Sequence, residues 1–121
     1  MTIRDSIVDD EEYAQRLAIK TNGGVTFLKV EDLSWIDAAG NYVRLNTREG
    51  DRHLLRETMS ALEKRLDPKR FVRIHRSTIV NVKRIREIRP QTHGEQLVVM
   101  EEGQRLTLSR SYRDRLQEFT S

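Results

Sequence analysis

Short runs in which apolar and polar residues alternate recur along most of the chain. Alternation with a period of two is typical of strands that bury one face. In the first half of the sequence it predicts strands at 17–21, 25–30, 34–39, 42–47 and 52–55. In the second half it predicts strands at 71–76, 85–89, 95–100 and 104–108.

Turn-forming residues separate these runs. An Asn-Gly pair at 22–23 and a Gly-Asn pair at 40–41 each stand between two predicted strands, which is the pattern of a tight β-hairpin. Further glycines with polar or charged neighbours occur at 49–51, 93–95 and 102–103. Frequent turns between short strands predict an all-β dominated fold of antiparallel sheets rather than a βαβ repeat.

Two short segments have helical periodicity instead. In residues 57–66, the apolar side chains Met59, Leu62 and Leu66 fall at i, i+3 and i+7, the spacing of one helical face. Thr58 or Ser60 is available as the N-cap. Pro68 disfavours helix at the residue before it and so ends this segment. A second helix is predicted from about 110 to 119, with Ser109 or Ser111 as its cap.

The chain has 121 residues, which is enough for one domain and excludes a multidomain enzyme. Residues 1–16 are acidic and weakly periodic, so we interpret them as a linker or tether in front of a domain at 17–121. No apolar run approaches the roughly 18 residues that a membrane span needs, and the N-terminus lacks the apolar stretch of a signal peptide. We therefore expect a cytoplasmic protein without a membrane partner.

Several kinds of chemistry lack the residues that they need. Cysteine is absent, which excludes disulfides, thiolate nucleophiles and Cys-ligated zinc. The three histidines, at 53, 75 and 93, are far apart, so we expect no metal site. No two glycines have the spacing of a phosphate-binding loop, and we expect neither a nucleotide nor another cofactor.

Positive charge is concentrated in the second half of the chain. Residues 1–60 carry 8 basic and 11 acidic side chains, whereas residues 61–121 carry 14 and 8. The densest stretch, 64–89, holds ten basic residues and two acidic ones. An anionic partner would bind there, although a solvated surface has the same composition. The two predicted helices are too far apart for a helix-turn-helix, so loops would have to contact the bases of any DNA.

The predicted strand at 71–76 connects this charge to a surface. Alternation places Val72 and Ile74 on a buried face, and Phe71, Arg73 and His75 on the other. We therefore expect cations to project from that second face. Arg76 follows at the end of the strand, where its side chain can reach outward.

Three ordered blocks of the sequence resemble the LytTR DNA-binding domain of bacterial response regulators. The blocks are WIDAAGNYV at 35–43, FVRIHRSTIVN at 71–81 followed by Ile85 and Ile88, and LSRSY at 108–112. The resemblance covers about residues 17–119. It implies an elongated body of stacked antiparallel sheets with two short helices, whose loops enter successive major grooves of double-stranded DNA at promoters, often as two domains on direct repeats.

The resemblance also implies three base-contacting residues, Asn41, Arg76 and Arg110. An asparagine amide can donate to and accept from an adenine edge, and a guanidinium suits guanine O6 and N7. Each residue has a simpler interpretation as well. Asn41 is a turn residue, Arg76 is a surface cation, and Arg110 is an exposed residue at a helix start, where an arginine is unfavourable unless an anion is near.

Five neighbours of these residues have donors that can hold the DNA backbone. The predicted phosphate contacts are Arg73, His75, Ser77, Lys83 and Arg113. Alternatively, His75 forms hydrogen bonds within the sheet, Ser77 caps the following turn, and Lys83 and Arg113 are only solvated. We interpret Trp35 and Tyr42 as packing residues rather than as stacking platforms for single strands.

Members of this family usually carry an N-terminal receiver domain or a membrane segment. Because residues 1–16 are too few for either, we expect a standalone regulator or an excised effector domain. One rival function is a LytTR-like module for protein interaction or dimerisation without DNA. The other is an enzyme, for which His75, Ser77 and Asp37 are the one assembly available; nothing in their spacing requires them to meet, so we expect no catalytic residues.

Overall fold

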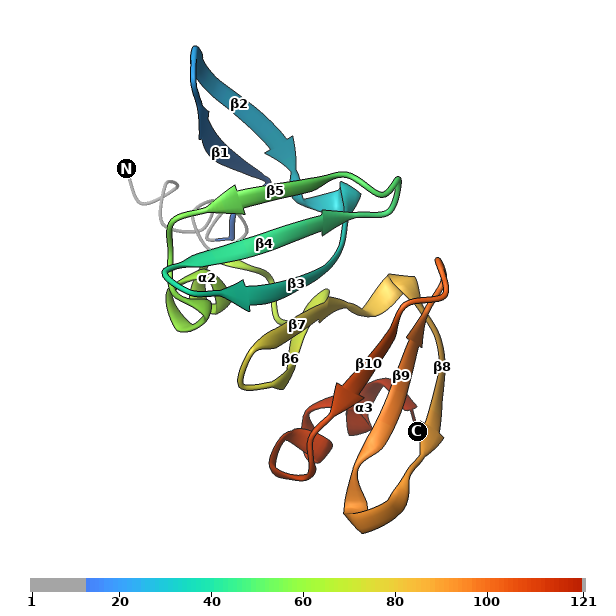
Figure 1. Cartoon of the computed structure of the whole chain (residues 1–121). Helices are drawn as coiled ribbons and strands as arrows, with labels where there is room; N and C mark the ends of the chain where they lie inside the picture. The colour runs from blue at the N-terminus through green and yellow to red at the C-terminus, as the bar shows by residue number, and fades with distance from the viewer. Residues whose placement is uncertain (1–12, 121) are drawn as a thin grey trace, which may run out of the picture.

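The computed structural model describes residues 13–120, which form three antiparallel sheets stacked along one direction (Figure 1). A hairpin of β1 (Arg16–Thr21) and β2 (Gly24–Lys29) lies at one end. The central sheet has the strand order β5-β4-β3-β7-β6, and the third sheet has the order β10-β9-β8. The prediction of an elongated, all-β dominated body is confirmed.

The remaining strands are short, as the alternation predicted. Their bounds are β3 (Leu33–Ala39), β4 (Tyr42–Thr47), β5 (Arg52–Leu55), β6 (Phe71–His75), β7 (Thr78–Asn81), β8 (Ile85–Pro90), β9 (Gln96–Met100) and β10 (Arg105–Leu108). Single turns of 3-10 helix connect some of them, namely η1 (Val30–Asp32), η2 (Val82–Arg84) and η3 (Thr92–Gly94).

Both predicted two-residue hairpin turns are present. Thr21 pairs with Gly24 across Asn22-Gly23, and Ala39 pairs with Tyr42 across Gly40-Asn41. In the second turn Gly40 has the positive φ, +66°, and Asn41 does not. A glycine with positive φ at the first central position is the pattern of a type II′ turn. The conformation of this turn therefore depends on Gly40.

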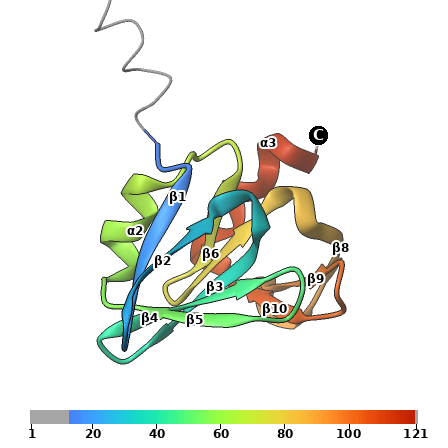
Figure 2. The same ribbon diagram turned by 90° about the horizontal axis from the view of Figure 1, so that it is seen from above.

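The predicted helix at 57–66 is α2 (Met59–Arg65). Its apolar stripe of Met59, Leu62 and Leu66 is buried. The Thr58 side chain accepts a hydrogen bond from the backbone N–H of Ala61 at 3.0 Å, so Thr58 is the N-cap. This helix covers one face of the central sheet (Figure 2).

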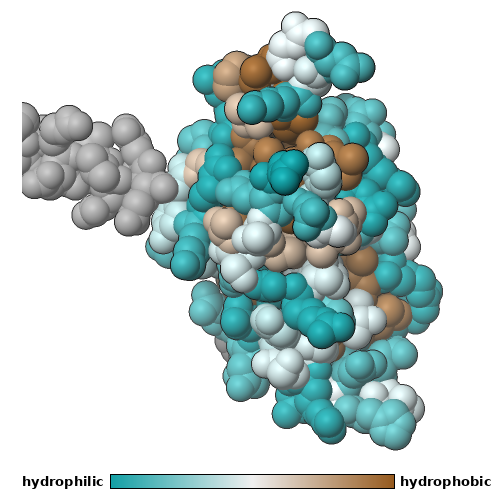
Figure 3. Space-filling view, turned by 60° about the vertical axis from the view of Figure 1, so that its left-hand side comes forward, coloured by the Kyte–Doolittle hydropathy of each residue, from teal (hydrophilic) through white to brown (hydrophobic). Residues whose placement is uncertain are grey.

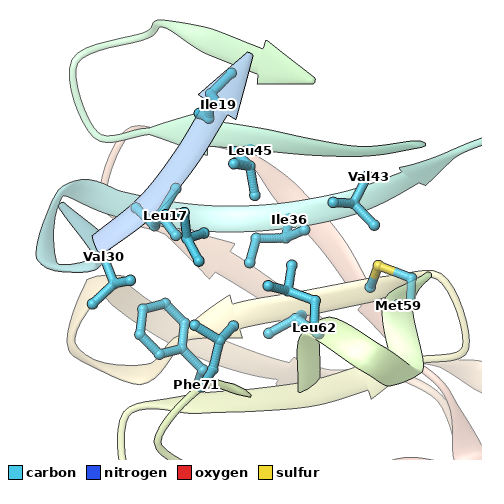
Figure 4. Close-up of a cluster of buried hydrophobic side chains, with 12 residues drawn as sticks. Leu17, Ile19, Val30, Ile36, Val43, Leu45, Met59, Leu62 and Phe71 are labelled. Atoms are coloured by element: carbon cyan, nitrogen blue, oxygen red, sulfur yellow. The ribbon is translucent and has the colours of Figure 1, made fainter. Parts of the chain in front are cut away.

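The first hydrophobic core lies between the β1–β2 hairpin, the central sheet and α2 (Figure 4). Its buried side chains come from all three parts: Leu17, Ile19, Val30, Leu33, Ile36, Val43, Leu45, Met59, Leu62, Leu66, Phe71 and Ile79. Burial of this size accounts for how a sheet, a helix and a hairpin hold together without disulfides.

A second core lies between the central sheet and the third sheet. Its buried residues are Val72, Ile74, Val80, Val98, Met100, Leu108 and Leu116. The hairpin of β6 and β7 contributes to both cores, because Phe71 and Ile79 face the first core while Val72 and Val80 face the second. Strand β7 was not predicted from the sequence.

The prediction that cations project from an open face of β6 is wrong. Val72 and Ile74 are buried in the second core, as the alternation predicted. The opposite face is covered by α2, which buries Phe71 and leaves the Arg73 side chain only 13% exposed. The cations therefore reach solvent at the end of the strand and not along its face.

The C-terminal segment is helical but differs in type from the prediction. It begins as a 3-10 helix, η4 (Arg110–Leu116), and ends as the short helix α3 (Gln117–Thr120). Ser109 occupies the N-cap position without a side-chain capping hydrogen bond, and its Oγ lies 3.3 Å from Ser111 Oγ. Leu116 and Phe119 anchor the segment on the second core.

The start of the chain bears on the predicted domain boundary. The predicted tether covers residues 1–16, of which 1–12 lie outside the described residues. The backbone N–H of Ala14 donates to the Arg65 carbonyl at 2.8 Å, and Ala14 packs against the first core. A domain that begins at residue 17 stays a prediction.

Within residues 13–120, no helix is long and apolar enough to cross a membrane. In the same part of the chain, no three His, Asp or Glu side chains gather where they could hold a metal ion. On the face that Figure 3 shows, apolar surface is most concentrated toward the β1–β2 end, smaller apolar patches lie below it, and most of the remaining surface is hydrophilic. The exposed large apolar residues include Val25, Phe27 and Leu54.

Candidate nucleic-acid interface

Three chain segments that carry the predicted base-contacting residues lie on the same side of the molecule, the left-hand side of Figure 1. They are the β3–β4 turn with Asn41, the β6–β7 turn with Arg76, and the start of η4 with Arg110. Two backbone hydrogen bonds join them. The N–H of Ala38 donates to the Ser77 carbonyl at 3.0 Å, and the N–H of Ser109 donates to the Ile74 carbonyl at 2.8 Å. Residues 69 positions apart in sequence therefore form one edge.

Asn41 projects from the tip of the first turn. Its side chain is exposed and makes no hydrogen bond to any of residues 13–120. Since Gly40 supplies the positive φ, the turn does not require an asparagine at position 41. The amide is left with both its donor and its acceptor available.

Arg76 stands in a turn that its neighbours hold closed. His75 Nδ1 accepts a hydrogen bond from the Ser77 N–H at 3.1 Å and lies 3.0 Å from Ser77 Oγ. Because Nδ1 accepts, the neutral ring carries its proton on Nε2. A register shift between Arg73 and His75 marks a bulge just before the turn, and bulges redirect side chains near functional sites.

Arg110 lies against a second loop. An added Cβ at Gly94 would be 2.7 Å from Arg110 Cδ and 3.3 Å from Cγ. Gly94 has φ +82°, and the preceding His93 has φ +62°. The absence of a side chain at residue 94 thus leaves room for the arginine stem, while its guanidinium is exposed at the start of η4.

Arg73 is held by its own domain. Its Nη1 donates to Ser60 Oγ at 3.1 Å and to Glu63 Oε1 at 3.2 Å, and its Nη2 donates to the Arg76 carbonyl. The other carboxylate oxygen of Glu63 accepts from Arg115 Nη1 at 3.1 Å. Arg73 therefore supports the β6–β7 turn from beneath.

The other predicted phosphate contacts occupy different positions. His75 and Ser77 flank Arg76, and Arg113 is exposed on η4 one turn beyond Arg110. Lys83 lies in η2, at the opposite end of the β6–β7 hairpin. The structure brings the first three to the edge that carries Asn41, Arg76 and Arg110, and it does not bring Lys83 there.

The cations along this edge differ from others in their pairing. Arg76, Arg110 and Arg113 form no ion pair with any carboxylate in residues 13–120. By contrast, Glu87 and Arg89 on β8 are joined at 2.8 Å. The hydrogen bond from Arg89 lowers the pKa of Glu87, and the same bond raises the pKa of Arg89. Unpaired guanidinium groups are those available to an anion.

The sequence did not identify two residues beside this edge. Tyr42 was expected to pack, yet it is 39% exposed next to Asn41; the burial of Val43 and Leu45 on one face was the available signal. Gly94 was recognised only as a turn residue, and its contact with Arg110 has no local sequence signal. Trp35 packs against the second core, as expected.

The three residues considered for an enzyme do not form one assembly. His75 and Ser77 are in contact, but the backbone of Ser77 occupies His75 Nδ1. The Asp37 carboxylate accepts instead from Arg44, at 2.9 Å, and from Asn46, at 3.0 Å. These contacts organise a turn and brace the adjacent strands.

Comparison with known proteins gives a consistent match. Residues 23–121 match the LytTr DNA-binding domain family. The chain is 28% identical over 103 residues to the sensory transduction protein LytT of Bacillus cereus, covering 85% of this chain and 42% of that protein. It is 27% identical over 110 residues to the transcriptional regulatory protein LytR of Staphylococcus aureus, covering 89% and 44%.

A solved structure agrees with these sequence matches. It is described as the LytTr DNA-binding domain of a putative methyl-accepting/DNA response regulator from Bacillus cereus. The TM-score is 0.79 at 27% identity, covering 89% of this chain and 98% of that one. The chain thus spans nearly all of that domain but less than half the length of the curated relatives.

Proposed function

The chain belongs to the LytTr DNA-binding domain family, and from that premise we propose that it binds double-stranded DNA sequence-specifically as part of a transcriptional regulator. Asn41, Arg76 and Arg110 read the bases. Reading occurs through loops that enter successive major grooves, and the whole protein acts in the cytoplasm without catalytic chemistry of its own.

One observation carries this proposal. Three segments distant in sequence are fixed to one another by the Ala38–Ser77 and Ser109–Ile74 backbone hydrogen bonds. Each presents an exposed polar side chain that forms no hydrogen bond or ion pair within the described part of the chain. Such preorganised, unpaired donors are what base recognition requires, because ordering them on binding costs little.

The chemistry of each side chain assigns it a base class. The Asn41 amide suits the N6 and N7 edge of adenine, and the forks of Arg76 and Arg110 suit guanine O6 and N7. His75 through Nε2–H, Ser77 through its hydroxyl and Arg113 through its guanidinium would hold phosphates. Arg73 is less free to move, because its guanidinium already donates to the Glu63 carboxylate. It would contact a phosphate while keeping that hydrogen bond.

Lys83 would meet the DNA backbone only if the duplex followed the protein around to η2. Bending by a protein is offset by the contacts that the bend allows. A Lys83 contact would therefore indicate a bent duplex.

Promoter direct repeats bound by two copies would fit the elongated shape. Copies related by translation along DNA touch through two different surfaces. The exposed Val25 and Phe27 on the outer face of the β1–β2 hairpin supply one apolar surface for such a contact. The same residues favour the second candidate, a dimerisation or protein-interaction module without DNA, because exposed apolar clusters mark protein contacts.

The deciding experiment selects bound duplexes from a random library and then compares the selected site with a scrambled duplex of equal length. The proposal expects enrichment of one motif and tighter binding to it. Equal binding to both duplexes would reject sequence-specific reading. Self-association by sedimentation without any DNA binding would support the second candidate.

A further inference from the structure

We propose that Glu63 is a positioning residue for base recognition, which sets the placement of Arg76 relative to Arg110. This inference rests on the proposed function of those two arginines. Glu63 lies on α2 and is not among the residues that would contact DNA. Its two carboxylate oxygens bind two arginines that come from different parts of the chain, Arg73 and Arg115.

One branch leads from Glu63 to Arg76. Glu63 Oε1 accepts from Arg73 Nη1 at 3.2 Å, and Arg73 Nη2 donates to the carbonyl of Arg76. The Arg73 side chain is only 13% exposed, so few alternative positions are open to it. The backbone carbonyl of Arg76 is therefore fixed from α2 through one guanidinium.

The other branch leads to the segment that begins with Arg110. Glu63 Oε2 accepts from Arg115 Nη1 at 3.1 Å, and the Arg115 guanidinium lies 4.9 Å from the centroid of the Tyr112 ring. Both residues belong to η4 (Arg110–Leu116). Tyr112 also packs against the second core, so this branch fixes η4 relative to α2.

The choice of a carboxylate at this point has an electrostatic reason. Two arginines that approach the same place repel each other, and a bidentate anion between them removes that repulsion. A neutral glutamine at 63 has one carbonyl oxygen, which accepts hydrogen bonds, and one NH2 group, whose two N–H bonds only donate. Its carbonyl oxygen can accept from one arginine, but its NH2 group then faces the N–H donors of the other arginine. The hydrogen bond from residue 63 to that second arginine must therefore break.

If Glu63 positions the arginines, replacing it should weaken binding to the preferred DNA site, although removing a negative charge ordinarily strengthens DNA binding. Removing an acidic residue from a protein that binds DNA strengthens attraction to phosphates, when charge alone acts. Positioning predicts the reverse for the preferred site, because misplaced guanidinium groups lose their base contacts. The two accounts therefore expect opposite changes in specific affinity for Glu63→Gln.

Glu57 supplies a matched control. It also lies beside α2 and pairs with an arginine, Arg65, at 2.8 Å. Neither Glu57 nor Arg65 has a hydrogen bond to the β6–β7 turn or to η4. Glu57→Gln makes the same change of charge and residue type without touching either branch.

The test measures binding of the whole chain to its selected duplex, to duplexes changed at single positions, and to random duplex. For Glu63→Gln we expect the ratio of selected to random affinity to fall about tenfold. We expect the loss of discrimination at the base positions assigned to Arg76 and Arg110, with the Asn41 position kept. Glu57→Gln should keep the full ratio.

A second readout does not depend on DNA. In the free protein, Glu63→Gln should shift the backbone amide resonances of residues 76–78 and 109–112, whereas Glu57→Gln should leave them in place. Unchanged resonances and an unchanged ratio for Glu63→Gln would overturn the proposal while sequence-specific binding stood. If the wild-type chain showed no sequence preference, the proposed function would be rejected. Shifted resonances in Glu63→Gln would then show only that Glu63 is structurally coupled to the β6–β7 turn and η4. A uniform loss at all three base positions would indicate general destabilisation and would also overturn it.

Discussion

The side chain of Arg110 lies across the backbone of Gly94, so closely that a Cβ at residue 94 would be 2.7 Å from Arg110 Cδ. These residues belong to different elements, η3 and η4. Gly94 thereby limits where Arg110, one of the arginines that we propose to contact bases, can stand.

Gly94→Ala should therefore displace Arg110. We expect loss of preference at the base position read by Arg110, of the order of 1–3 kcal/mol, with less effect at the other positions. Binding to single-position variants of the selected duplex measures this. The matched control is Gly103→Ala: Gly103 has φ +97°, but its Cβ would meet open space. Both substitutions strain the backbone, so an equal effect of both on base preference would contradict the role of the Arg110 contact.

Substitutions of the arginines that we propose to contact bases should differ from substitutions of the residues that we propose to contact phosphates. Arg76→Ala and Arg110→Ala should each cost about 1–3 kcal/mol on the selected site and relax one base position. Arg113→Ala should weaken selected and random DNA about equally and reduce the salt slope by about one unit. Titrations at several salt concentrations separate the two patterns. If Arg76→Ala weakened both duplexes by the same factor, its assignment to a base would be wrong.

Binding should depend strongly on salt, because unpaired cations along the edge displace condensed counterions. With about five phosphate contacts, affinity should fall roughly a hundredfold or more between about 50 and 200 mM monovalent salt. A mobility-shift or fluorescence titration across that range tests it. A flat dependence would exclude the electrostatic part of the proposed function.

Two asparagines should have opposite roles. Asn81 is 1% exposed, and its amide donates to the Leu33 carbonyl at 2.8 Å while its Oδ1 accepts from the Lys83 N–H. Asn81→Ala should lower the free energy of unfolding by about 1–3 kcal/mol, because a buried carbonyl loses its partner. Asn41→Ala should leave stability within about 0.5 kcal/mol and weaken the selected site. Denaturant unfolding and binding assays on both variants test this. A large loss of stability for Asn41→Ala would indicate that Asn41 serves the turn rather than DNA binding.

Local chemistry was sufficient for some elements and not for others. The Asn22-Gly23 hairpin and the stripe of Met59, Leu62 and Leu66 each carry their own signal, and both predictions are confirmed. Strand β7 was missed because Ile79 and Val80 are buried on opposite faces, which removes the alternation that marks a half-exposed strand.

The candidate site shows the same division. The order of the sequence blocks pointed to Asn41, Arg76 and Arg110, and their assignment to bases stays a prediction. The pairing of Arg73 with Glu63 depends on where α2 docks against β6, and that is decided by the packing of Leu62 and Phe71 in the first core. Neither local spacing nor charge density contains that information.

The β6–β7 hairpin packs one face against the first core and the other face against the second, which couples the unfolding of the two cores. Neither core can dissolve without exposing one face of the same two strands, so the two halves should lose structure together in a single cooperative transition. The amides of Val72 and Val80 should then be among the slowest to exchange with solvent. Arg76 would then extend from one of the last parts of the chain to unfold, and thermal fluctuations of the outer hairpins would leave its position largely unchanged.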